Sequence, residues 1–272
     1  MLRLGRLKDA LRRSIARHRR SGLVTAIHGA AAFVESAWHN EDADFETNGE
    51  RFALERLRAA EFKVALDVGA NVGQWTNAAL ALWPHCHIHA FEVAPKTFAG
   101  LEANARTWSG ADRAHLHPFG LSDAAGTLPM YYYPDRHELT SDTPRHDGLT
   151  MVPFEAPVTT LDQFCSDRRV DHIDYLKIDV EGAEHRVLNG ASALLQANRI
   201  DCIQFEYGAF SIDTRVMLRD YFGWLGPSHV IGKIFPTHVA FADYEWTMES
   251  FRFSNYLCIS RQRGDLQRLV AG

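Results

Sequence analysis

The stretch from residue 62 to residue 82, FKVALDVGANVGQWTNAALAL, decides the fold. A short apolar run ends at Val68, the chain turns through Gly69 and Gly73, and a segment of helical character follows. Glycine permits a tight turn and a close approach of the backbone to a ligand, and the start of the next helix offers unpaired N–H groups. The stretch therefore predicts a strand, a ligand-binding turn and a helix in succession.

The same alternation continues along the chain. Apolar, strand-like runs occur at residues 87–93, before residue 121, and at 173–180, 201–207 and 253–259, with helical segments at 96–107 and 183–197. Short apolar strands that alternate with helices predict βαβ units and a mostly parallel, doubly wound α/β sheet. Residues 127–160 break this rhythm with two extended runs, 128–133 and 155–160, which we interpret as an inserted β-hairpin.

We divide the chain into three parts. Thr47 and Glu50 form a capping-box pattern that predicts a helix over about residues 48–60 and marks the start of the α/β domain. The prediction is an N-terminal helical extension at residues 1–46, an α/β domain at residues 47–262 and a C-terminal tail at residues 263–272.

Charge is distributed unevenly. The whole chain has a net charge of −5, yet residues 1–20 contain eight Lys or Arg and only one acidic residue, Asp9. The acidic remainder argues against nucleic acid as the main partner. Leu4, Leu7, Leu11 and Ile15 have helical spacing within the basic segment, which predicts an amphipathic helix. Three interpretations stay open: docking on the protein itself or a partner subunit, contact with an anionic membrane surface, or a weak targeting signal.

The four cysteines carry no metal-binding pattern, so we expect thiols in a reducing compartment. This predicts a cytoplasmic protein, with peripheral contact at the membrane as the alternative for residues 1–20. The apolar run at residues 22–34 is too short to span a bilayer.

The glycine turn discriminates between nucleotide ligands. A dinucleotide site is typically G-x-G-x-x-G, whereas this turn has Asn71 between Gly69 and Gly73. The spacing favours a ligand without a pyrophosphate, and Asp67 at the strand end suits an ammonium group. A purely structural strand-to-helix turn is the alternative interpretation.

Two further strand ends carry polar groups. Glu92 lies 19 residues after Gly73, where a carboxylate can accept both hydroxyls of a ribose. Ser122 and Asp123 follow the third strand, where a short side chain can bind the adenine amino group, or where both residues form an ordinary turn.

The fourth strand leads into the stretch LKIDVEGAE, residues 176–184. Asp179 and Glu181 at its end can bind an ammonium group, hold a cation or act as a base. Lys177 shares a face of the strand with Asp179, so it also fits the role of neutralising a buried carboxylate. Glu206, after the fifth strand, is placed to hold a divalent cation such as Mg²⁺ together with Asp179.

Over residues 47–260 the chain resembles the FkbM family of S-adenosylmethionine-dependent methyltransferases. The resemblance rests on residues 67–73, 91–95, 120–123, 160–162 and 176–184, in the family's order. Position 93 is Val where the family often has Pro, although Pro95 keeps its place. The resemblance implies a seven-stranded, Rossmann-like sheet of the class I methyltransferase type and methyl transfer to a hydroxyl of a sugar, a glycan or a natural product.

The predicted site combines these positions. The residues expected to bind S-adenosylmethionine are Asp67, Gly69, Ala70, Asn71, Gly73, Glu92, Ser122, Asp123 and Asp179. The residues expected to act in catalysis are Asp179, Glu181 and Glu206. The inserted segment is expected to form the acceptor wall, because aromatic rings stack on sugars and His can take a proton, through Tyr132, His137 and His146.

Competing functions also stay open. A nicotinamide-dependent oxidoreductase would use the same type of sheet, but the glycine spacing disfavours it. A non-catalytic nucleoside-binding module would keep Asp67 and Glu92 and bind no acceptor. Methylation of a nucleobase amino group typically requires an Asn-Pro-Pro-Tyr quartet after the fourth strand, where this chain has Asp179-Val180-Glu181-Gly182. The oligomeric state is not predicted.

Overall fold

In the computed structural model, residues 2–144 and 148–272 are described. The chain divides into two compact units, residues 1–41 and residues 42–272. The larger unit therefore begins five residues before the predicted boundary at residue 47. It also includes the segment predicted as a tail, because helix α11 (Gly264–Val270) buries Leu266 and Val270 in its core.

The larger unit is built on an eight-stranded sheet in the order β10-β9-β11-β8-β7-β1-β2-β3. Neighbouring strands from β3 to β8 are parallel, and β11 is antiparallel to both β8 and β9. The strands are β1 Val64–Val68, β2 His87–Phe91, β3 Ala114–His117, β7 Ile173–Ile178, β8 Ile200–Tyr207, β9 His229–Phe235, β10 His238–Phe241 and β11 Ser254–Ser260. The mostly parallel, Rossmann-like sheet is confirmed. The sheet has one strand more than the seven expected, because the chain reverses direction after β9 and pairs antiparallel with it as the edge strand β10.

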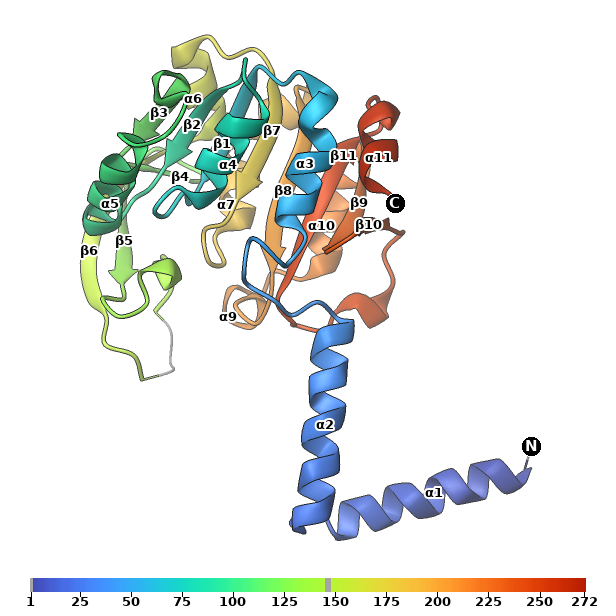
Figure 1. The fold of residues 1–272 in the computed structure, drawn as a ribbon. Coiled ribbons are helices and arrows are strands. Elements are labelled where there is room, and N and C mark those ends of the chain that lie inside the picture. Colours follow the sequence, from blue (N-terminus) through green and yellow to red (C-terminus); the bar gives the residue numbers. More distant parts are fainter. Residues whose placement is uncertain (1, 145–147) are drawn as a thin grey trace. The chain divides into compact units, whose positions relative to one another are not determined.

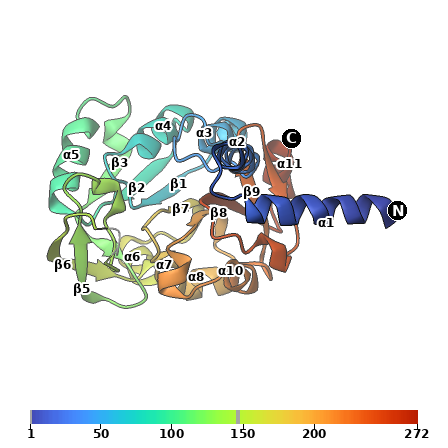
Figure 2. The ribbon, with the colours of Figure 1, turned by 90° about the horizontal axis from the view of Figure 1, so that it is seen from below.

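Helices cover both faces of this sheet (Figures 1 and 2). One face carries α3 (Glu50–Arg56), α4 (Gln74–Leu82), α5 (Pro95–Ala105) and α11. The other carries α6 (Leu161–Arg168), α7 (Glu184–Asn189), α8 (Ser192–Gln196) and α10 (Leu218–Leu225). The remaining short helices are η1 (Leu57–Ala60), η2 (Ala111–Arg113), η3 (His137–Leu139), α9 (Ser211–Thr214) and η4 (Trp246–Met248).

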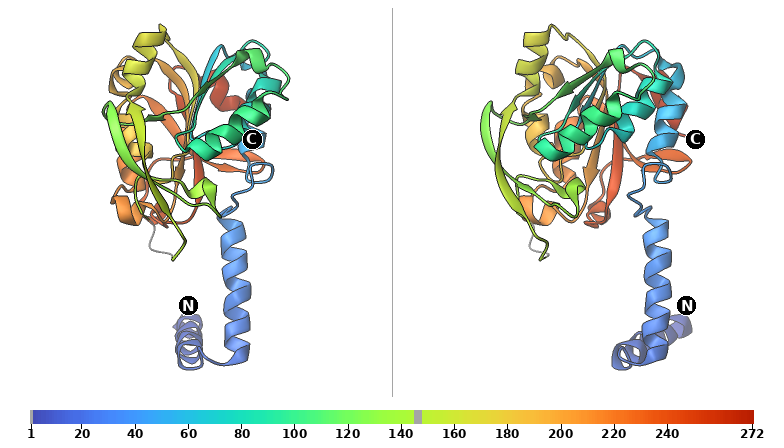
Figure 3. Two further views of the ribbon diagram at one scale, coloured as in Figure 1. Left: turned by 90° about the vertical axis from the view of Figure 1, so that its left-hand side faces the viewer. Right: turned by 60° about the vertical axis from the view of Figure 1, so that its left-hand side comes forward.

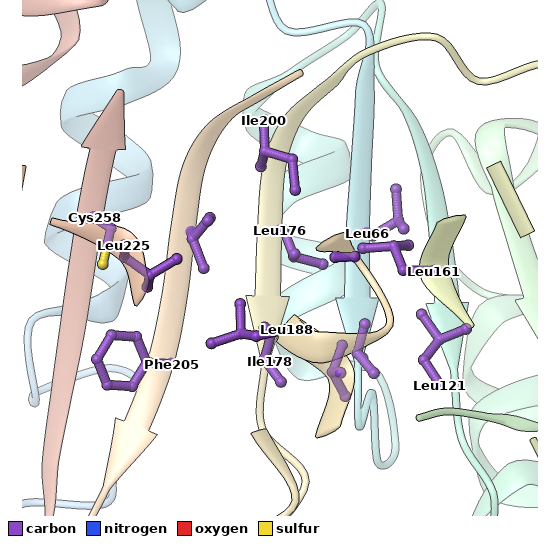
Figure 4. Packing of buried hydrophobic residues seen from close by; sticks show 14 of the residues in the cluster. Leu66, Leu121, Leu161, Leu176, Ile178, Leu188, Ile200, Phe205, Leu225 and Cys258 are labelled. Carbon is purple, nitrogen blue, oxygen red and sulfur yellow. The ribbon is translucent and has the colours of Figure 1, made fainter. Parts of the chain in front are cut away.

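Buried apolar side chains hold the layers together. In Figure 4, Leu66, Ile178 and Phe205 lie on neighbouring strands β1, β7 and β8, whereas Cys258 lies on β11, which runs the opposite way. These side chains pack against Leu188 of α7 and Leu225 of α10 in one continuous core. Strands β7 and β8 are buried along almost their whole length, as expected for central parallel strands covered by helices on both sides.

The predicted capping box at the start of α3 is wrong. The residue before the helix is Gly49, with a φ of +101°, and a Cβ there would meet the Phe235 carbonyl oxygen at 2.3 Å. Thr47 instead donates a hydrogen bond to Asp42, at 2.6 Å between the two side-chain oxygens. Because the close approach to β9 requires glycine, the chain enters the helix through Gly49, and Glu50 becomes a buried residue.

The inserted hairpin is confirmed. Strands β5 (Gly126–Tyr132) and β6 (Val152–Thr159) pair antiparallel, and β6 also pairs with β4 (Gly120–Leu121), which gives a separate three-stranded sheet. Figure 3 shows β5 and β6 as a long hairpin beside the main sheet. Helix η3, whose first residue is His137, lies between these two strands in the sequence.

Four histidines of β2 and β3 form a feature that we call the histidine ladder: His87, His89, His115 and His117. His89 Nδ1 lies 3.0 Å from His117 Nε2, and His87 Nδ1 lies 3.1 Å from His115 Nε2. Burial, together with the neighbouring histidines and Arg168, lowers the pKa of His89 to about 3 and that of His117 to about 4. The buried pair is therefore neutral at neutral pH.

The smaller unit consists of two helices, α1 (Leu2–Arg17) and α2 (Gly22–Trp38). The Ser21 side chain caps α2 by accepting a hydrogen bond from the Val24 N–H. The amphipathic helix predicted within residues 1–20 is present as α1. Among the described residues, no helix combines the length and the apolar character that are needed to cross a bilayer.

Candidate functional site

The turn after β1 has the backbone conformation that its glycines require. Gly69, Asn71 and Gly73 all have positive φ angles, of +87°, +49° and +85°. A Cβ on Gly69 would lie 1.7 Å from the Asp179 carbonyl oxygen, so the turn packs directly on the end of β7. A side chain at this position would separate the two strand ends.

Glu92 braces this turn from the end of β2. Its two carboxylate oxygens accept hydrogen bonds from the Asn71 N–H at 3.0 Å and the Ala94 N–H at 2.8 Å. Burial raises the pKa of Glu92 to about 7, although both hydrogen bonds act in the opposite direction. Each oxygen keeps a second lone pair, so the carboxylate is still able to accept hydrogen bonds from a ligand.

Two pockets meet at the turn. The first pocket lies between the turn, the end of β2 and the inserted hairpin, and is lined by Val68, Gly69, Asn71, Phe91, Glu92, Val93, Gly120, Leu121, Leu128, Met130, His137, Glu138, Thr140, Val158, Asp179 and Val180. The second pocket lies on the other side of the turn, and is lined by Ala43, Phe45, Glu50, Gly69, Ala70, Asn71, Val72, Gln74, Trp75, Lys177, Asp179 and Glu206. Gly69, Asn71 and Asp179 belong to both, so one elongated ligand can occupy both pockets.

The second pocket has more carboxylates than cations. Glu50, Asp179 and Glu206 line it together with Lys177, whose Nζ lies 2.7 Å from Asp179 Oδ2. Burial by itself lowers the pKa of Lys177, but Asp179, Asp67 and Glu50 raise it further than burial lowers it. Lys177 is therefore charged and pairs with Asp179, and Glu50 and Glu206, whose pKa values are raised by burial, supply further carboxyl oxygens that can accept hydrogen bonds from an ammonium group.

Asp67 does not reach either pocket. Its carboxylate is fully buried, accepts a hydrogen bond from Thr76 at 2.6 Å and lies 3.7 Å from Lys177 Nζ. The predicted direct contact with a ligand ammonium group is thus not seen in this geometry. The alternation of β1 turns Asp67 toward α4, where it anchors the first turn of that helix and the base of the glycine turn.

Asp179, Glu181 and Glu206 come together at the ends of β7 and β8. Oxygen atoms of the three carboxylates lie within 4.8 Å of one another. Burial raises the pKa of Glu206, and the charges of Asp179 and Glu181 raise it further. The neighbouring Glu184 has a structural role, because its Oε1 accepts hydrogen bonds from the Val180 and Gly182 N–H groups and shapes the loop that carries Glu181.

Of the other predicted site residues, some line a pocket and some do not. His137 lines the first pocket, whereas Tyr132 does not and instead has Lys96 Nζ 5.6 Å from the centroid of its ring. Ser122 and Asp123 directly follow the pocket residues of β4, and the Ser122 hydroxyl donates to Asp123 at 3.0 Å. Asp123 also lies 3.6 Å from Arg186 of α7, which supports the turn interpretation. His146 lies outside the described residues.

Sequence reasoning missed two polar residues at this edge. Glu50, at the start of α3, is buried against Gln204 of β8 and lines the second pocket. Asn255 of β11 pairs in register with Glu206 of β8 and is buried. The carboxyl edge of β8 is also the starting edge of the antiparallel β11, so a polar residue early in β11 was the available signal.

Several buried polar atoms in these walls lack a hydrogen-bond partner within the described part of the chain. They include Asn71 Oδ1 and His137 Nδ1 at the first pocket and Trp75 Nε1 at the second. Both side-chain polar atoms of Asn255, which lies opposite Glu206 on the neighbouring strand but lines neither pocket, are also unpaired. Unpaired buried polar atoms are costly, so such a concentration indicates a site built for a polar ligand. The second pocket is acidic near Glu206, and the first pocket is apolar near Phe91 and Leu121.

The strand order, the glycine turn and the two pockets that meet at it define an α/β protein with the class I methyltransferase fold. Comparison with known families makes this specific. Residues 67–229 match the methyltransferase FkbM domain, and the chain belongs to this family.

The chain is similar to several proteins that are named as methyltransferases. The chain is 34% identical over 154 residues to the 31-O-demethyl-FK506 methyltransferase FkbM of Streptomyces tacrolimicus, which covers 47% of this chain and 58% of that protein. It is 27% identical over 208 residues to the hexuronic acid methyltransferase AglP of Haloferax volcanii, and this match covers 74% of this chain and 81% of that protein. It is 27% identical over 153 residues to the 2-O-methyltransferase NoeI of Sinorhizobium fredii, and this match covers 50% of this chain and 60% of that protein. The match thus spans less than two thirds of the FkbM and NoeI proteins.

Proposed function

We propose that this chain is an S-adenosylmethionine-dependent methyltransferase that acts on a hydroxyl group of a sugar, a glycan or a glycosylated natural product. The observation that carries the proposal is the meeting of the two pockets at Gly69, Asn71 and Asp179. One pocket contains Glu92 for a ribose, and the other contains a surplus of carboxylates for a cationic amino acid. The names of the relatives support oxygen as the acceptor atom.

The two ends of the cofactor would be held by different groups. Glu92 accepts hydrogen bonds from the ribose hydroxyls, and the apolar side chains of Phe91 and Leu121 enclose the adenine. Asp179 and Glu50, which both line the second pocket, receive the ammonium group. The unpaired N–H groups at the start of α4 receive the carboxylate of the methionine part. The bound cofactor supplies a methyl group activated by a positively charged sulfonium.

The acceptor hydroxyl must lose its proton as the oxygen is methylated. Glu206 is the proposed base, because a buried carboxylate of raised pKa takes up a proton readily once it is ionised. Glu181, whose carboxylate lies beside that of Glu206, would orient the hydroxyl. A divalent cation held by the same three carboxylates is the second route, since it would lower the pKa of the hydroxyl directly. The inserted hairpin, through His137, would border the acceptor.

Ligand binding tests the cofactor assignment. We expect S-adenosylhomocysteine to bind the wild-type protein and NAD not to bind, as measured by isothermal titration calorimetry. Glu92→Ala should weaken binding about 100-fold or more, because two hydrogen bonds to a charged group are lost at about 1.5–3 kcal/mol each. Glu102→Ala, an exposed glutamate of α5, is the matched control and should bind normally. Preference for NAD would show that the site is not a methyltransferase site.

Methyl transfer tests the acceptor assignment and separates an enzyme from a binding module. The assay follows S-adenosylhomocysteine release and the mass of the acceptor, with neutral glycosides and uronic acids as candidates and nucleosides as the control class. A methyl ether on a sugar hydroxyl is the expected product. Methylation of nucleosides alone would overturn the sugar assignment, while cofactor binding without any turnover across these acceptors would favour the non-catalytic module.

Glu206→Gln tests the base. We expect kcat to fall about 10²- to 10⁴-fold, the usual contribution of a general base, with S-adenosylhomocysteine affinity changed less than about tenfold. Glu245→Gln, an exposed glutamate, is the control. Treatment with EDTA distinguishes the two routes: unchanged activity supports the base, whereas loss that Mg²⁺ restores assigns these carboxylates to a cation. Full activity of Glu206→Gln would remove Glu206 from either role.

A further inference from the structure

We infer that the helices α1 and α2 form a docking surface for an anionic lipid bilayer, with α2 lying along the interface. The inference concerns residues 1–41 and does not depend on the proposed chemistry of the α/β unit. It rests on the exposure of α2, its length and the charge that precedes it.

Helix α2 is an apolar helix without a buried residue. It contains one charged residue, Glu35, and its large apolar side chains are Leu23, Ile27, Phe33, Val34 and Trp38, which are 56–78% exposed. At 100° per residue, Leu23, Ile27, Val34 and Trp38 share one side of the helix, while Thr25, His28 and Ser36 lie on the other. Covering each large apolar side chain is favourable, so a continuous uncovered stripe of this kind marks an interaction surface.

The dimensions favour an interfacial position over a spanning one. Helix α2 has 17 residues, which corresponds to about 25 Å at 1.5 Å per residue, whereas the hydrocarbon core of a bilayer is about 30 Å thick. The polar residues of α2 lie towards its two ends, with Thr25 and His28 in the first half and Glu35 and Ser36 near the last turn. Trp38, at the end of the helix, is of the type that concentrates at membrane–water interfaces.

The positive charge of α1 indicates that the partner of this surface is an anionic lipid bilayer. Residues 1–20 carry eight Lys or Arg and one Asp, and the apolar residues Leu7, Leu11 and Ile15 are exposed between them. An apolar stripe flanked by cations matches anionic headgroups above an acyl layer. A second copy of the chain is a poorer fit, because it would bring the same concentrated positive charge to the contact.

Vesicle co-sedimentation of the full-length protein tests the inference. We expect binding to vesicles of equimolar phosphatidylglycerol and phosphatidylcholine, little binding to phosphatidylcholine alone, and weakening as salt is added. Changing Arg12, Arg13 and Arg17 together to Gln should weaken binding about 100-fold, since each cation near an anionic surface contributes about fivefold. The matched control changes three exposed arginines of the α/β unit to Gln: Arg58, Arg106 and Arg199.

The apolar stripe has an equally close control. Trp38 and Trp246 are 78% and 80% exposed, the first on α2 and the second on the α/β unit. Trp38→Ser should reduce vesicle binding at least tenfold, whereas Trp246→Ser should leave it unchanged. Equal effects of the two variants, or absence of binding to anionic vesicles, would overturn the inference. Self-association in vesicle-free ultracentrifugation that Trp38→Ser abolishes, without vesicle binding, would assign the surface to a second copy instead.

Discussion

Lys177→Met is expected to lower the free energy of unfolding by about 3–5 kcal/mol, the usual result of removing one partner of a buried ion pair. Lys177 is almost fully buried and is the cation that faces both Asp67 and Asp179. Without it, these carboxylates remain in the interior with no compensating charge. Since whole domains are stable by about 5–15 kcal/mol, the loss is large enough to be seen directly in urea unfolding.

The loss of stability caused by Lys177→Met should increase as the pH rises. Burial raises the pKa of Asp67 and of Glu50, and Lys177 opposes this in both cases. A carboxyl whose pKa is higher in the folded state binds a proton there, so its contribution to stability is lost as pH rises through that pKa. Without Lys177 these pKa values rise further, and the deficit should be larger at pH 8 than at pH 6.

The exposed Lys63, which lies immediately before β1, provides the control. Lys63→Met should change stability by no more than about 0.5 kcal/mol, as is usual for surface substitutions. A deficit below about 1 kcal/mol for Lys177→Met, equal at both pH values, would contradict the structural role of the ion pair.

Acid should destabilise the α/β unit through the histidine ladder. The pKa values of His89 and His117 are lowered to about 3 and about 4, against about 6.5 in the unfolded chain. A buried neutral His stabilises the fold fully above the unfolded pKa, and this stability is lost as pH falls below it. Between pH 7 and pH 5 the two residues together should remove about 3–4 kcal/mol from the free energy of unfolding.

Other groups act in the opposite direction, so the test is a comparison of pH dependences. The buried carboxyls of Glu92 and Glu184, with pKa values raised to about 7 and about 8, favour the folded state as pH falls. We therefore compare the wild-type protein with a His89→Gln, His117→Gln double variant by urea unfolding at both pH values. The variant should lose less stability on acidification, whereas the exposed His28 and His85, changed in the same way, should leave the pH dependence unaltered. Identical pH dependences for both double variants would exclude the ladder as the cause.

Much of the site could be predicted because parallel strands end at a common edge. Glu92 and Asp179 follow strands β2 and β7, and the order of strands and helices alone places both beside the glycine turn. The inserted hairpin was likewise predictable from its two extended runs. These signals are local, because each is contained in a few consecutive residues.

The missed and misassigned residues depend on contacts between distant segments. Glu50 meets Gln204, 154 residues away in the sequence, and Gly49 replaces the predicted cap because β9 approaches it. Asp67 was expected at the ligand because it stands at a strand end, but the alternation of β1 directs it toward Thr76 of α4. Which face of a strand is covered, and by which helix, is decided by packing across the whole unit.

The sequence by itself determined the class of fold, the glycine turn and the carboxylates at the strand ends, because hydrophobic period and backbone freedom are properties of short segments. Only the tertiary structure decided which carboxylates are buried with Lys177, that one turn divides the site into two pockets, and that the last residues form a packed helix. Burial and ion pairing depend on segments far apart in the chain, and they exist only when the sheet has brought those segments together.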